Sequence, residues 1–171
     1  MLRPPIWLMA LPLLFSAAAS GSAPSSPRPG EPTFLGQDRL AQLRSRYDRE
    51  SDPVRKAKRL VPLGDAEFDD IQKQMADGNM SGALGELREY QTQADSVEKA
   101  LDAKGRSAEK HPGGYKELQF SVRESLRRLN SVIVNLTSDE QQPFLEIRKG
   151  LDDLNRRLIA ELFPSQPASS Q

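Results

Sequence analysis

The chain of 171 residues contains no cysteine, so it can form neither disulfide bonds nor the thiolate ligand sets of common zinc sites. Its stability must therefore come from side-chain packing. Only one histidine, His111, is present, and a single histidine cannot build a multi-histidine metal centre. The sequence accordingly predicts no metal site and no cofactor.

Aromatic residues are scarce and charge of one sign is not in excess. Aromatics make up 6% of the chain, while Lys plus Arg and Asp plus Glu each number 24, so the net charge is zero. A nucleic-acid binder normally carries a clear basic excess. We therefore expect no nucleic-acid partner.

The chain has one long apolar run, at its N-terminus. Arg3 supplies a positive charge, residues 6–18 are almost wholly apolar, and small residues follow at 17–21. The run is shorter than the roughly 20 residues that span a bilayer, and its order is that of a secretory signal. We predict a signal peptide over residues 1–19, export to the periplasm or outside the cell, and no stable membrane insertion after cleavage. An uncleaved N-terminal anchor is the alternative.

Ser, Pro and Gly are concentrated at both ends of the remaining chain. Residues 20–33 and residues 164–171 lack apolar periodicity, which predicts a disordered N-terminal spacer and a short disordered tail. The intervening residues 34–163 are long enough for one domain with a core of its own.

Apolar residues in this domain recur every three or four positions, which is typical of helices and not of strands. Asp52 and Pro53 predict the start of a helix. Gly78 and Asn79 predict the end of a helix. Pro62 is expected to end a short helix, and Pro143 to lie in the first turn of the last one. The predicted helices cover residues 35–51, 53–61, 64–77, 81–104, 115–136 and a final segment that ends before residue 164.

The predicted fold class is all-α, an antiparallel helical bundle of about four to five helices. Three of the longer segments carry a single apolar stripe each, and stripes of this kind are buried most economically against one another. The stripe from Tyr115 to Leu136 has coiled-coil-like spacing. It would also suit a seam between two chains, so a homodimer stays open.

Charge is unevenly distributed along the chain. Residues 38–59 contain eight Lys and Arg against four Asp and Glu, whereas residues 65–102 contain three against ten. We interpret this asymmetry as an acidic hairpin that packs beside basic helices. The alternative is that the acidic hairpin receives a basic partner or cations.

Two basic clusters are candidate binding sites. The first contains Arg55, Lys56, Lys58 and Arg59, and the second contains Arg123 and Arg127 beside Arg128. The first is interpreted as an ordinary helix surface, with anion or partner binding as the alternative. The second is interpreted as a set of ties between helices, with a partner site as the alternative.

His111 lies in the polar loop 105–114 next to Pro112 and two glycines, which favours a turn residue. It could otherwise serve as a general base beside Glu109 or Glu117. His111 and the neighbouring Tyr115 are also candidate contacts for a partner.

These observations predict a non-catalytic protein-binding module whose partner is another protein of unknown identity. No nucleophile–base pair, phosphate loop or ligand set is recognisable in the sequence. A first alternative is an envelope sensing module that binds cations or small amphiphiles through the acidic hairpin 65–102. A second alternative is an enzyme that uses His111.

Overall fold

The computed structural model describes residues 33–164, with side chains from Asp38 onward. The predicted signal peptide, spacer residues 20–32 and tail residues 165–171 lie outside these described residues. All regular structure between residues 33 and 164 is helical, which confirms the predicted all-α class. The helices are α1 (Thr33–Asp48), α2 (Pro53–Ala76), α3 (Met80–Asp102), α4 (Tyr115–Ile133) and α5 (Ser138–Leu162). None of these helices is both long enough and apolar enough to cross a membrane.

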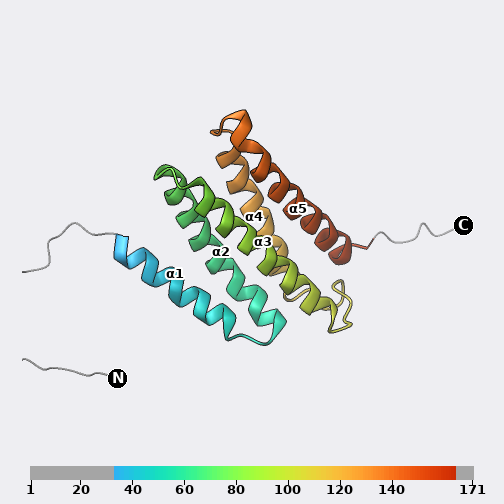
Figure 1. Ribbon diagram of the computed structural model, residues 1–171. Helices are drawn as coiled ribbons and strands as arrows, with labels where there is room; N and C mark the ends of the chain where they lie inside the picture. The colour runs from blue at the N-terminus through green and yellow to red at the C-terminus, as the bar shows by residue number, and fades with distance from the viewer. Residues whose placement is uncertain (1–32, 165–171) are drawn as a thin grey trace, which may run out of the picture. The chain divides into compact units, whose positions relative to one another are not determined.

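Successive helices run in opposite directions, as Figure 1 shows. Helices α2 and α3 pack on each other, α4 packs on both of them, and α5 packs on α3 and α4. Helix α1 packs along α2 at the edge of this group (Figure 1). The predicted antiparallel helical bundle is therefore confirmed, as four core helices with α1 added to their side.

The core is filled by the apolar stripes of α2 to α5. The rings of Phe68 and Tyr90 meet edge to face, with centroids 5.6 Å apart, and the Tyr90 hydroxyl lies 2.9 Å from Ser121 Oγ. Gly64 makes this arrangement possible, because a Cβ there would lie 2.8 Å from the Tyr90 ring. The remaining large side chains with almost no exposure are Leu60, Leu63, Ile71, Leu87, Leu118, Leu129, Phe144, Leu151, Leu154 and Leu158.

The predicted break before Pro62 is wrong, because α2 continues through it from Pro53 to Ala76. A proline in a helix interior costs about 3 kcal/mol. Leu60 and Leu63 lie on either side of it and are fully buried, and each such burial is worth about 1.5–3 kcal/mol. The continuous stripe therefore outweighs the missing backbone donor, and Pro62 itself faces solvent.

Several predicted helix ends are confirmed. Asp52 caps α2, with its side chain accepting from the Arg55 backbone N–H at 3.0 Å. Gly78, just after α2, has a φ of +78°, and Gly114, the N-cap of α4, has a φ of +90°. A Cβ on Gly114 would lie 2.6 Å from a Leu101 methyl group.

Two other ends differ from the prediction. The helix predicted from residue 81 begins earlier, because Asn79 caps α3 and its side chain accepts from the Gly82 N–H at 3.1 Å. Thr137 caps α5, so Pro143 lies one turn deeper in this helix than expected. Asn79 and Thr137 are both residues that cap helices well, and a cap earlier in the sequence lengthens its helix by a few residues.

Candidate functional site

One arginine faces three carboxylates where α1 crosses α2 and α3. The Arg44 Nη2 atom of α1 lies 2.9 Å from Glu67 Oε1 of α2 and 3.1 Å from Glu86 Oε1 of α3, and its Nε lies 3.8 Å from Glu89 Oε1. We call these four residues, together with Gln93, the Arg44 junction. It fixes α1 to both helices of the acidic hairpin.

The centre of the Arg44 junction is a buried carboxylate. Glu67 is 0% exposed, and burial raises its pKa while Arg44 lowers it. Gln93 Nε2 donates to Glu67 Oε1 at 3.4 Å. Three buried polar side-chain atoms among the described residues have no hydrogen-bond partner: Arg44 Nε, Glu67 Oε2 and Gln93 Oε1. All three belong to this junction, so the contact between α1 and the hairpin is incompletely satisfied.

A second carboxylate of the junction titrates near neutral pH. Gln74 Nε2 donates to both Asp70 Oδ2 and Glu86 Oε2, at 2.7 Å each. Burial and the nearby Asp70 carboxylate raise the pKa of Glu86 to about 7. The shallow hollow here has a volume of about 400 Å³ and is lined by Leu40, Ala41, Arg44, Asp70, Gln74, Glu86 and Glu89. Glu86 can therefore exchange a proton with solvent in the physiological range.

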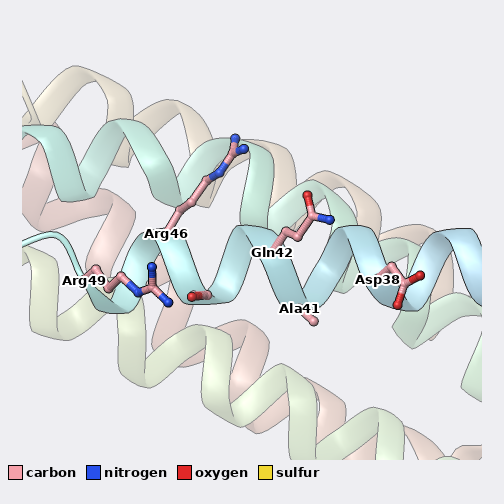
Figure 2. Close-up of a pocket in the computed structure, with 6 residues that line it drawn as sticks. Asp38, Ala41, Gln42, Arg46 and Arg49 are labelled. Atoms are coloured by element: carbon pink, nitrogen blue, oxygen red, sulfur yellow. The ribbon is translucent and has the colours of Figure 1, made fainter.

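A further hollow, of about 510 Å³, lies on the outer side of α1. Figure 2 shows its lining side chains spread along this one helix. They are Asp38, Ala41, Gln42, Ser45, Arg46 and Arg49. Because no second element supplies a wall, this hollow is an open surface. Within residues 38–164, no group of three or more acidic or histidine side chains is placed to hold a metal ion.

Other arginines also neutralise the acidic hairpin. Arg128 of α4 pairs with Asp69 and donates to the Asp65 carbonyl at 3.0 Å. Arg157 of α5 lies 2.7 Å from Glu98. Together with Arg44, they bring a cation to the hairpin from each of α1, α4 and α5. For these carboxylates, the interpretation that basic helices match the acidic hairpin is confirmed.

The predicted basic run lies at the start of α2, where its side chains have partners nearby. Arg55 Nε lies 3.2 Å and Arg59 Nη2 lies 2.9 Å from the carboxylate of Glu50. Glu50 also accepts from the Asp52 backbone N–H, so these contacts close the link between α1 and α2.

The two lysines of the run are engaged as well. Lys56 Nζ lies 4.6 Å from the centroid of the Tyr47 ring, and Lys58 Nζ lies 3.8 Å from Glu117 Oε1. The contacts of the run thus fit the helix-surface interpretation, and its role in partner binding stays a prediction.

The second basic cluster divides between two roles. Of its three arginines, only Arg128 contacts another helix. Arg127 pairs with Glu124 on its own helix, and the Arg123 guanidinium lies 5.8 Å from the centroid of the exposed Phe120 ring. The expectation of interhelical ties is therefore wrong for Arg123 and Arg127, because both lie on the outer face of α4.

His111 and Tyr115 are close in sequence but differ in environment. His111 is exposed in the loop between α3 and α4. Glu117, one of the two acids predicted beside His111, accepts from the Gly114 N–H through its Oε2 atom. Tyr115 is 3% exposed and donates to Asp102 Oδ1 at 2.9 Å, so it belongs to the core and offers a partner almost no surface. Enzymatic use of His111 and cation binding by the hairpin stay predictions.

Arg44, Glu67, Glu86 and Gln93 were not among the site residues predicted from the sequence. A signal for Glu67 was present, because it lies on the same stripe as Leu60, Leu63 and Ile71 at helical spacing. A glutamate in a buried stripe requires a cation nearby. The partner itself is distant in sequence, so only the fold could identify Arg44.

Large apolar side chains are exposed on both α4 and α5. Gln119 Nε2 donates to Asn155 Oδ1 at 3.1 Å, which aligns the two helices. Phe120 follows Gln119 and is 49% exposed, and Ile159 lies one turn beyond Asn155 and is 41% exposed. Phe163, directly after α5, is 71% exposed. We call Phe120, Arg123, Arg127, Ile159 and Phe163 the α4–α5 surface.

Comparison with known proteins gives no relative from which a function could be transferred. No family model matches the sequence, and neither a curated protein nor a solved structure matches it.

Proposed function

We propose that this chain is a non-catalytic protein-binding module that is exported to the periplasm or outside the cell. The observation that carries the binding role is the α4–α5 surface, which exposes three large apolar side chains and two arginines, one of them stacked on Phe120. Aromatic residues and arginine are the types enriched in protein interfaces, where they contribute most to affinity.

The composition of the α4–α5 surface favours a protein partner. Stacking of Arg123 on Phe120 holds the ring in place at low entropic cost, so less order must be gained on binding. Arg127 is paired only with Glu124 at an exposed position, where an ion pair is worth at most about 1 kcal/mol. Both arginines are therefore available to acidic groups of a partner.

The test of the binding role compares two variants of the full chain. Phe120→Ser with Ile159→Ser removes apolar area from the α4–α5 surface. Val134→Ser removes an even more exposed apolar side chain just beyond the opposite end of α4. Each protein is used as bait in extracts of the producing cells, and the recovered partner is purified and titrated.

We expect the wild type and the Val134 variant to bind alike, and the double variant to bind about tenfold more weakly or worse. Equal affinity of all three proteins would exclude the α4–α5 surface. Failure to recover any partner, together with turnover of a substrate in an activity screen, would contradict the non-catalytic role.

Export rests on the N-terminal pattern of a cation, an apolar run and small residues. Fractionation of the producing cells tests it. We expect a shortened chain outside the cytoplasm, and full-length precursor in the cytosol would contradict export.

A further inference from the structure

The contact between α1 and the acidic hairpin is unlike the contacts among α2 to α5. Between residues 38 and 48, Tyr47 is the one buried apolar side chain of α1, and Leu40 and Leu43 are only partly buried. Polar contacts supply the rest, through Arg44 and through the Tyr47 hydroxyl, which donates to the Gln93 carbonyl at 3.3 Å. Interfaces that combine a few apolar contacts with polar ones are typical of segments that dissociate and rebind.

Part of the surface beneath α1 is charged and would gain hydration if α1 left. Burying a carboxylate costs several kcal/mol even when it is paired, so release of α1 would return hydration to Glu67 and Glu86. The three unpartnered buried atoms of the Arg44 junction would gain water as partners. The contacts that α2 to α5 make with one another do not involve α1. Departure of α1 therefore leaves a folded bundle with an acidic groove on α2 and α3.

We propose that this groove is a docking site for a basic helix of a partner protein, and that α1 occupies it as an internal competitor. Helix α1 indicates the chemistry of the partner helix, because α1 contacts the groove through Leu40, Leu43, Arg44 and Tyr47. The partner helix carries the same order on one face, two apolar residues, an arginine and an aromatic residue, as in other helix-in-groove complexes. Charge complementarity supports a basic partner, because Glu67, Glu86 and Glu89 share a single arginine.

This inference rests on the proposed protein-binding function but uses a surface separate from the α4–α5 surface. It also gives α1 a regulatory role. A tethered helix competes at a high effective concentration, so the groove binds a partner only after α1 has been displaced. The contacts of Glu50 with Arg55 and Arg59 close the link next to α1 and favour the occupied state.

The test uses the full chain with Arg44→Glu, which places a fourth acid against the three carboxylates and releases α1. The probe is a fluorescent synthetic peptide with the sequence of residues 38–50. A shuffled peptide of the same composition serves as the matched control, because it keeps the charge and loses the helical face. Binding is followed by fluorescence anisotropy.

We expect the probe to bind the Arg44→Glu chain about tenfold or more tightly than the wild-type chain, and the shuffled peptide to bind neither. Equal binding to both chains, no binding to either, or equal binding of the shuffled peptide would overturn the proposal. Loss of the helical signal of α2 to α5 as well as that of α1, measured by far-ultraviolet dichroism of the variant, would also overturn it, since α1 would then be inseparable from the fold.

Sedimentation of the wild-type chain distinguishes the source of the helix. A dimer that forms with increasing concentration and disappears in the Arg44→Glu chain would assign the groove to α1 of a second copy and would overturn the partner protein. Variants at Phe120 and Ile159 do not touch the groove, so failure here leaves the test of the α4–α5 surface intact.

Discussion

Replacing Arg44 with methionine tests the electrostatic account of the α1 contact. The change keeps much of the side-chain volume and removes the cation, so Glu67 stays buried without a charge partner. Breaking a buried ion pair in this way costs about 3–5 kcal/mol in general. Here the loss has an upper limit, because Glu67 can take up a proton instead.

The limit follows from the pKa of a carboxyl group in water, about 4.3 for glutamate. One pH unit corresponds to about 1.4 kcal/mol, so protonation at pH 7 costs about 3.7 kcal/mol and at pH 5 about 1 kcal/mol. Arg44 keeps 33% of its side chain exposed, and water therefore already screens part of its charge. We expect Arg44→Met to lower the free energy of unfolding by about 2–4 kcal/mol at pH 7 and by about 1 kcal/mol at pH 5.

Urea unfolding at the two pH values measures these losses, and a double-mutant cycle with Glu67→Gln assigns them. The neutral amide needs no cation, so Arg44→Met in the Glu67→Gln background should cost about 1 kcal/mol or less at both pH values. A loss of the same size at pH 5 and pH 7, or an undiminished loss in the Glu67→Gln background, would refute the reasoning.

Four further variants probe other parts of the fold by urea unfolding. Pro62→Ala restores a backbone donor inside α2 and should stabilise the chain by about 1–3 kcal/mol; a loss of stability would show that the proline is required. Gly114→Ala places a Cβ at a residue with positive φ and against Leu101, so it should lower the free energy of unfolding by about 1–3 kcal/mol. Gly85→Ala, with open space around it, should raise the free energy of unfolding by about 0.5–1 kcal/mol. Equal effects of the two variants would contradict this reasoning. Burial and Asp70 raise the pKa of Glu86 to about 7, so the folded chain binds the extra proton. The wild type therefore loses this stability as the pH rises from about 4.3, the pKa of a free glutamate, through 7; Glu86→Gln should lack that decline, and an unchanged pH profile would contradict the assignment.

The fold class was predictable because the long helices carry regular apolar stripes. Spacings of three and four from Tyr115 to Leu129 specify which face of α4 is buried, and the structure buries that face. The helix end predicted at Pro62 is wrong because proline is a local signal and the burial of the surrounding stripe is not. The cost of Pro62 is set by one lost backbone donor, whereas the gain comes from burying Leu60 and Leu63 in the core of the bundle, which no local pattern contains.

The roles of charged residues were less predictable than the fold. Arg127 and Arg128 are adjacent in sequence, yet adjacent residues on a helix point about 100° apart. One of them therefore pairs within α4 while the other reaches α2. The asymmetry of charge along the chain did predict internal matching, but only the packing of α1 on the hairpin could select Arg44 as the partner of Glu67.

Helix α1 is held by the Arg44 junction and should open as a separate unit. Native-state hydrogen exchange of the wild-type chain tests this separate opening, because it reports the opening free energy of each helix. We expect the amides of α1 between residues 41 and 48 to exchange through an opening whose free energy is several kcal/mol lower than that of the buried turns of α3. Exchange of α1 and α3 with the same opening free energy would contradict it.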